Sequence, residues 1–179
     1  MLLGDEIVAV LTGYMTDEKY GERKVARLAV HVINGDGSLG KGCTISIGLP
    51  AEWMPSCHHL MWRPDEPPIA GAVAKLRGFL REHRGRRLLY LQSESMLVND
   101  VILAGMPEAA MTNVSDDVRK ILRDATGHVA VDEQLLHSLV AYCAGKSGAK
   151  PYEGLKQFPD CGDDAIAFAR CVGMLRRLK

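Results

Sequence analysis

The fold predicted for this chain depends mainly on residues 25–37, which have the sequence VARLAVHVINGDG. Apolar side chains recur at every second position of this stretch, which is the period of a β-strand. Residues 34–37, Asn-Gly-Asp-Gly, then predict a tight turn, because Asn and Gly tolerate the positive φ angles of hairpin turns. The alternating residues 44–49 supply the returning strand, and the apolar run at residues 7–11 supplies one more strand before the hairpin. We therefore expect a three-stranded antiparallel meander.

Predicted helices and strands alternate after the meander. Helices are expected from Ile69 to a stop at Gly85, over residues 95–104, after a cap at Ser115 and after a cap at Asp132. The last helix is expected from Asp163 onward, and residues 145–162 before it are expected to be a flexible connector. Strands are expected at residues 88–91 and 109–114. A meander followed by β-α units implies an α/β fold with a mixed sheet and helices on its faces. The length of 179 residues fits a single domain over residues 1–179.

The composition is that of an ordinary soluble protein, with 47% apolar and 25% charged residues. Lys+Arg and Asp+Glu balance at 22 each, so the chain has no overall positive field to attract nucleic acid. A local basic run exists, and it is either a solvated helix face or a set of phosphate contacts. Its members are Arg77, Arg81, Arg84, Arg86 and Arg87.

Thiol usage and the absence of a targeting segment predict a cytoplasmic protein. The first residues form neither a basic leader nor a long apolar run, and no segment is long enough to span a bilayer. Reduced thiols are therefore expected, and no pair has Cys-x-x-Cys spacing. The five cysteines are Cys43, Cys57, Cys143, Cys161 and Cys171.

Two adjacent acids open the last predicted helix. At helical spacing Asp164 falls in line with Phe168, Val172 and Leu175, the stripe that should face the core. A carboxylate on that side costs several kcal/mol unless a partner or a metal compensates it. Asp164 is thus the best candidate for a functional acid, with Asp163 beside it. The alternative is structural, because acids on a first turn interact favourably with the helix dipole.

The order of the elements resembles the ribonuclease H-like fold, in particular the four-acid (DEDD-type) branch of 3′–5′ exonucleases that use two metal ions. The first strand of that family carries Asp-x-Glu, where this chain has residues 11–13, Leu-Thr-Gly. In the family's third motif a His or Tyr precedes an Asp-Ala pair by four or five residues. Asp164 and Ala165 match the pair, while Pro159 and Asp160 stand in the earlier positions.

The second family motif places an acid after the fourth strand, followed by a leucine four residues later. Asn99 stands at the position of the acid, Leu103 is the leucine, and Asp100 lies one helical step away. The resemblance therefore implies that only Asp164 keeps its place among four expected acids. Hydrolysis by two Mg²⁺ ions needs several oxygen ligands around cations roughly 4 Å apart. A neutral amide at Asn99 and the side chains of residues 11–13 do not replace them.

The sequence therefore predicts an exonuclease-like domain with a degraded metal site. We expect it to act without a cofactor as a non-catalytic module that binds nucleic acid or assembles with a protein, and that does not enter a membrane. One alternative is an active Mg²⁺- or Mn²⁺-dependent exonuclease with relocated carboxylates. Either Asp17 or Glu18 takes the first-strand position, or Asp100, Asp160, Asp163 and Asp164 form a rebuilt site. Another alternative is a protein–protein adaptor without affinity for nucleic acid.

Overall fold

The computed structural model describes residues 7–16, 23–46, 69–83, 85–91, 111–131, 134–148, 150–155 and 161–177. Their fold is α/β, and one five-stranded sheet with the order β3-β2-β1-β4-β5 organises it. β2 (Arg23–Ile33) pairs antiparallel with both β1 (Ile7–Thr16) and β3 (Leu39–Ser46). β4 (Arg87–Tyr90) runs parallel to β1, and β5 (Met111–Asn113) runs parallel to β4.

The turn predicted at residues 34–37 connects β2 to β3. The Asn34 amide donates to the Ser38 carbonyl and the Gly37 amide to the Asn34 carbonyl, both at 2.9 Å. The Asp36 carboxylate accepts from the Ser38 amide and hydroxyl. Gly37 has a φ angle of +80°, which a residue with a Cβ rarely adopts. The strand after this turn begins at Leu39 instead of residue 44, because the short turn lets pairing start at once.

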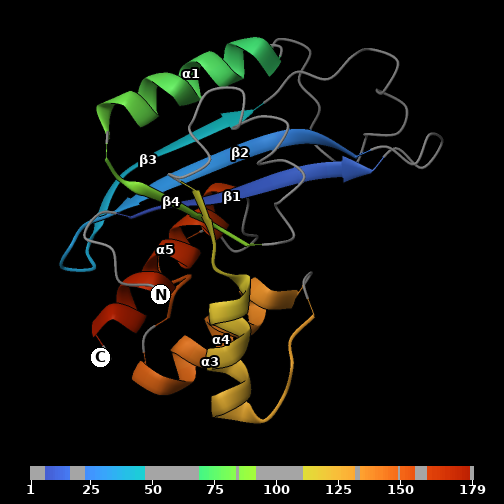
Figure 1. The fold of residues 1–179 in the computed structure, drawn as a ribbon, viewed down its shortest axis with the longest axis vertical. Helices are drawn as coiled ribbons and strands as arrows, with labels where there is room; N and C mark the ends of the chain where they lie inside the picture. Colours follow the sequence, from blue (N-terminus) through green and yellow to red (C-terminus); the bar gives the residue numbers. More distant parts are fainter. Residues whose placement is uncertain are drawn as a thin grey trace.

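Helices cover both faces of the sheet (Figure 1). α1 (Ile69–Glu82) lies on one face and contacts β3. α5 (Cys161–Arg177) lies across β1, β2 and β3 on the other face, with α4 (Leu135–Ser147) and α3 (Ser115–Thr126) next to it. Ala29, Val30, Val32 and Ile33 of β2 are all buried, although neighbours on a strand face opposite ways. The sheet is therefore the middle layer of the protein.

Two predicted helix caps and the connector are wrong in detail. α3 begins at Ser115 itself, and the side-chain oxygen of Asn113 accepts from the Ser115 amide at 2.9 Å. The N-cap residue of α3 is therefore Val114, not Ser115, and it makes no side-chain cap hydrogen bond. The N-cap of α4 is Gln134, not Asp132. α4 also continues to Ser147, inside the expected connector, because Gly145 is tolerated within a helix at a cost of about 1 kcal/mol.

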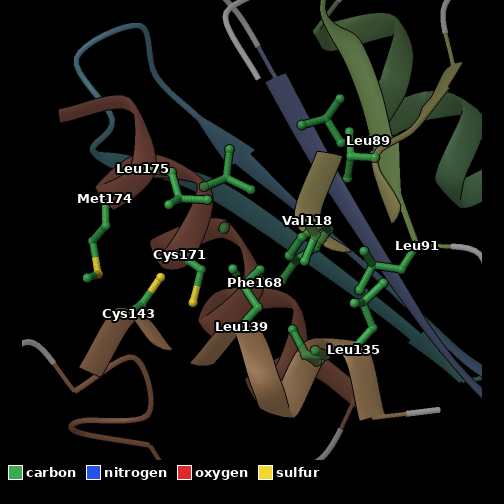
Figure 2. Close-up of a cluster of buried hydrophobic side chains, with 14 of the residues drawn as sticks. Leu89, Leu91, Val118, Leu135, Leu139, Cys143, Phe168, Cys171, Met174 and Leu175 are labelled. Carbon is green, nitrogen blue, oxygen red and sulfur yellow. The ribbon is translucent and has the colours of Figure 1, made fainter. Parts of the chain in front are cut away.

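A hydrophobic cluster lies between the sheet and the layer of α3, α4 and α5 (Figure 2). Leu89 and Leu91 come from β4 and its end, Val118 from α3, Leu139 from α4 and Phe168 from α5. Burial of apolar surface at about 25 cal/mol per Å² makes this cluster the main reason that α5 is fixed on the sheet. The predicted helix over residues 95–104 lies outside the described residues. None of the described helices is both long and apolar enough to cross a membrane.

Candidate functional site

The first turn of α5 carries the two acids singled out in the sequence. Phe168 and Val172 of the predicted stripe are fully buried, and Leu175 is 7% exposed. Asp163 is also only 7% exposed, whereas Asp164 is half-buried. The inward stripe is therefore confirmed, but the deeper of the two carboxylates is Asp163 and not Asp164.

Asp164 has a hydrogen-bond donor from outside its helix. The hydroxyl of Tyr152 donates to Asp164 Oδ1 at 2.5 Å. The pKa of Tyr152 is raised well above its usual range, first by burial and then by its hydrogen bond to Asp164 and the negative charge there. Tyr152 therefore remains protonated and keeps donating at physiological pH. A hydrogen bond from a neutral donor to a charged carboxylate is shorter and stronger than a hydrogen bond between two neutral groups.

Arg170 holds the turn that carries Tyr152. Arg170 Nη1 donates to the carbonyl of Pro151 at 2.7 Å and to that of Glu153 at 2.9 Å. The turn is closed by the amide of Glu153, which donates to the Lys150 carbonyl at 2.8 Å. Residues 150–155 are thus attached to α5 at two points, the Asp164 carboxylate and the Arg170 guanidinium. This contact could not be predicted from the sequence, because the pattern of residues 145–162 predicts only a flexible connector.

The positive charge of Arg170 affects the pKa of His31 on β2. Burial is the largest cause of a lowered pKa for His31, and the positive charge of Arg170 lowers it further. Its backbone hydrogen bond to Val32 opposes these effects. The imidazole is therefore neutral at pH 7. It is a structural member of the sheet with no acidic partner among its described interactions.

The first turn of α5 lies away from the end of the sheet where β1 and β4 begin. The other end of the helix is anchored there, because Arg176 Nη1 donates to the Asn34 carbonyl at 2.9 Å and Gly173 contacts Gly37. The register places Ile33 opposite Ile7, the first residue of β1. At 1.5 Å per residue, Asp164 lies about 15 Å along the helix from this anchor.

The described donors do not fit a site for two divalent cations. Asp163 and Asp164 are adjacent on a helix, and adjacent helical side chains do not face one another. Within the described ranges, no group of three or more His, Cys, Asp or Glu side chains could hold a metal ion. The register of β1 sets Leu11 opposite Ala29, and residues 11–13 of this strand carry no carboxylate. Asn99, Asp100 and Asp160 lie outside the described residues, as do Asp17 and Glu18.

The basic run divides between two elements. Arg77 and Arg81 belong to α1, on the face of the sheet opposite α5 (Figure 1). Arg86 and Arg87 stand at the start of β4, and Arg87 pairs with Ile7 at the end of the sheet where α5 is anchored. Arg81 is exposed, and the other three are half-buried. Arg84 lies outside the described residues. The structure thus separates the basic run from Asp164 instead of bringing them into one groove.

Sequence comparison and structure comparison give different answers. No protein-family model and no curated protein matches the sequence. Among solved structures, the crystal structure of cell-death related nuclease 4 matches with a TM-score of 0.60. The fold of this chain is similar to the fold of that protein. The match covers 98% of this chain at 10% identity, and the chain spans 64% of the length of that nuclease. At this identity the likeness concerns the fold, and the chemistry must be argued from the residues present.

Proposed function

We propose that this chain is an exonuclease-like domain that binds nucleic acid without hydrolysing it. The observation that carries the proposal is the hydrogen bond between Tyr152 and Asp164. Asp164 is the acid that matches the family motif, and one of its oxygens already has a protein donor. A Mg²⁺ ion would have to share this carboxylate with Tyr152 and find most of its remaining ligands elsewhere.

The shortage of ligands supports the same conclusion. A two-metal nuclease stabilises the attacking and the leaving oxygen with a pair of cations held by several carboxylates. Residues 11–13 of β1 offer no carboxylate, and Asn99 offers a neutral amide. A scaffold can survive the loss of its chemistry, because fold stability and catalysis rest on different residues. An intact α/β fold with few hard ligands therefore favours a binding role.

The segment from residue 69 to residue 91 supports nucleic acid as the ligand. It holds six of the 22 basic residues of the chain and one of the 22 acidic residues, Glu82. Glu82 is itself paired with Lys41 of β3 at 3.0 Å. Lys75 and Arg81 are exposed on α1 and stand available to phosphate. A locally positive surface on a chain of zero net charge attracts a polyanion to one place.

Hydrolysis is tested with a labelled single-stranded oligonucleotide and Mg²⁺ or Mn²⁺. We expect no metal-dependent shortening by the wild-type chain. Shortening that disappears in Asp164→Ala would contradict the proposal and establish an active exonuclease with relocated carboxylates. Asp164→Asn is the matched variant, because it keeps the shape of the side chain and removes its charge.

Binding is tested by gel retardation of the same oligonucleotide over a series of salt concentrations. We expect the logarithm of the binding constant to fall linearly with that of salt, by roughly 0.7 for each phosphate contact on a single strand. The double variant Lys75→Gln with Arg81→Gln should lower this slope by about 1.4. Lys120→Gln with Lys146→Gln, two exposed lysines of α3 and α4, is the control that should leave it unchanged. Absence of retardation at low salt would favour the adaptor without nucleic-acid affinity.

A further inference from the structure

Two buried cysteines meet where α4 packs on α5. Cys143 of α4 and Cys171 of α5 are both thiols, and both are 0% exposed. Figure 2 shows their side chains directed toward one another, in the part of the cluster that Met174 and Leu175 close off. The sequence placed these cysteines 28 residues apart without relating them. The packing of the two helices creates the pair.

The two thiols are hydrogen-bonded to one another and are not equivalent. The hydrogen bond with Cys171 lowers the pKa of Cys143, against the effect of burial. The same hydrogen bond is the largest cause that raises the pKa of Cys171, and burial adds to it. Cys143 is therefore the thiol more easily converted to thiolate, with Cys171 as its donor. A thiolate with a neighbouring thiol is the arrangement from which a disulfide forms.

We propose that Cys143 and Cys171 are a peroxide-sensitive pair that forms a disulfide joining α4 to α5. The Cys143 thiolate attacks hydrogen peroxide, the O–O bond breaks, and a sulfenic acid forms with release of hydroxide. The Cys171 sulfur then attacks the Cys143 sulfur, and the leaving hydroxyl departs as water with the Cys171 proton. The first hydroxide takes up the proton lost from Cys143. Two thiols and one peroxide thus give one disulfide and two waters.

Burial determines which oxidant suits the site. Both sulfur atoms lie inside the hydrophobic cluster, so a mixed disulfide with a tripeptide such as glutathione has no room beside them. Hydrogen peroxide is little larger than water and needs only a brief opening of the two helices. The sulfur atoms, once joined, close a loop of about 28 residues, and such a cross-link stabilises the folded state mainly by constraining the unfolded chain.

The test is peptide mapping of the full-length chain after treatment with hydrogen peroxide. The protein is alkylated under denaturing conditions and digested without reductant. We expect a linked peptide pair containing Cys143 and Cys171, reversed by dithiothreitol, and a rise in Tm of roughly 5–15 °C. Cys43→Ala should keep the linked pair, because Cys43 lies on β3, and the charges that act on its thiol belong to Lys41 of β3 and to Lys75 and Glu82 of α1. Cys143→Ala should abolish both the link and the rise in Tm.

The wild-type chain alone can overturn the proposal, whether or not the variants fold. Recovery of Cys143 and Cys171 as alkylated thiols from peroxide-treated protein would do so. A link from either cysteine to Cys43, Cys57 or Cys161 in place of the expected pair would also do so. Glutathione disulfide serves as the second oxidant, and linkage by it at a rate equal to that of peroxide would refute the role given to burial.

Discussion

Gly173→Ala should destabilise the protein, although the same exchange in a helix usually stabilises. A Cβ at Gly173 would lie 2.3 Å from the carbonyl oxygen of Gly37, and a Cβ at Gly37 would lie 2.8 Å from the oxygen of Gly173. Both obstacles are backbone atoms, so no side chain can rotate away. The hairpin turn at residues 34–37 would have to move off α5. The hydrogen bond from Arg176 to the Asn34 carbonyl would move with it.

The magnitude follows from two opposing effects. Alanine is favoured over glycine within a helix by roughly 0.5–1 kcal/mol. Overpacking of a tight contact costs typically about 1–3 kcal/mol, and the upper part of that range applies when the backbone must shift. We therefore expect Gly173→Ala to lower the free energy of unfolding by about 1–2 kcal/mol. Gly78→Ala in α1 is the matched control, because a Cβ there meets nothing within 4 Å. It should raise the free energy of unfolding by about 0.5–1 kcal/mol.

The assay is urea denaturation of the three proteins, followed by circular dichroism at a helical wavelength. The midpoint should fall for Gly173→Ala and rise for Gly78→Ala, with equal m-values. A gain in stability for Gly173→Ala equal to that of Gly78→Ala would show that the Cβ of residue 173 does not collide with the Gly37 carbonyl. The close packing of the turn against α5 would then not depend on glycine at positions 37 and 173.

Three further predictions concern Tyr152, Arg170 and His31. Tyr152→Phe should lower the free energy of unfolding by about 1–2 kcal/mol, because it removes a hydrogen bond to a carboxylate. Tyr142→Phe, at another half-buried tyrosine, is the control and should change the free energy of unfolding little in the same urea assay. Arg170→Ala should release the turn at residues 150–155, and limited digestion with chymotrypsin should then cut after Tyr152, a result that unchanged protection would contradict. The pKa of His31 lies below its ordinary value of 6.5 in the folded state, so the unfolded chain binds more protons. The contribution of neutral His31 to stability is present above pH 6.5 and is lost as the pH falls through the lowered pKa. The His31→Gln variant should therefore lose less stability between pH 7 and pH 5 than the wild type. Equal losses in the two proteins would exclude this role for His31.

Local pattern was sufficient to predict most elements that the structure describes. The turn at residues 34–37 could be predicted because its residue types are selected by backbone geometry within four residues. α1, from Ile69 to Glu82, followed from apolar spacing with a glycine just beyond it, and Gly85 does adopt a positive φ of +83°. The start of α3 was harder. The oxygen that accepts from its first amide belongs to Asn113, at the end of a strand of three residues.

The candidate site could be predicted only in part, for a physical reason. A single inward stripe on α5 assigns Asp164 to the core, but α5 packs against the sheet, α4 and the β2–β3 turn at once. More of its circumference is therefore buried, which is why Asp163 is deeper than the stripe suggests. The partner of Asp164 is Tyr152, 12 residues earlier in a segment without periodicity. Only the path of the chain in three dimensions sets such a contact.

The proposed function requires that the chain binds nucleic acid and leaves it intact. The most direct measurement is a binding titration in Mn²⁺ with an end-labelled single strand, in which each sample is run on a native gel and, after denaturation, on a sequencing gel. We expect retardation of the strand at low salt together with an unchanged strand length after prolonged incubation. A ladder of shortened products in the wild type that is missing in Asp164→Ala would contradict it.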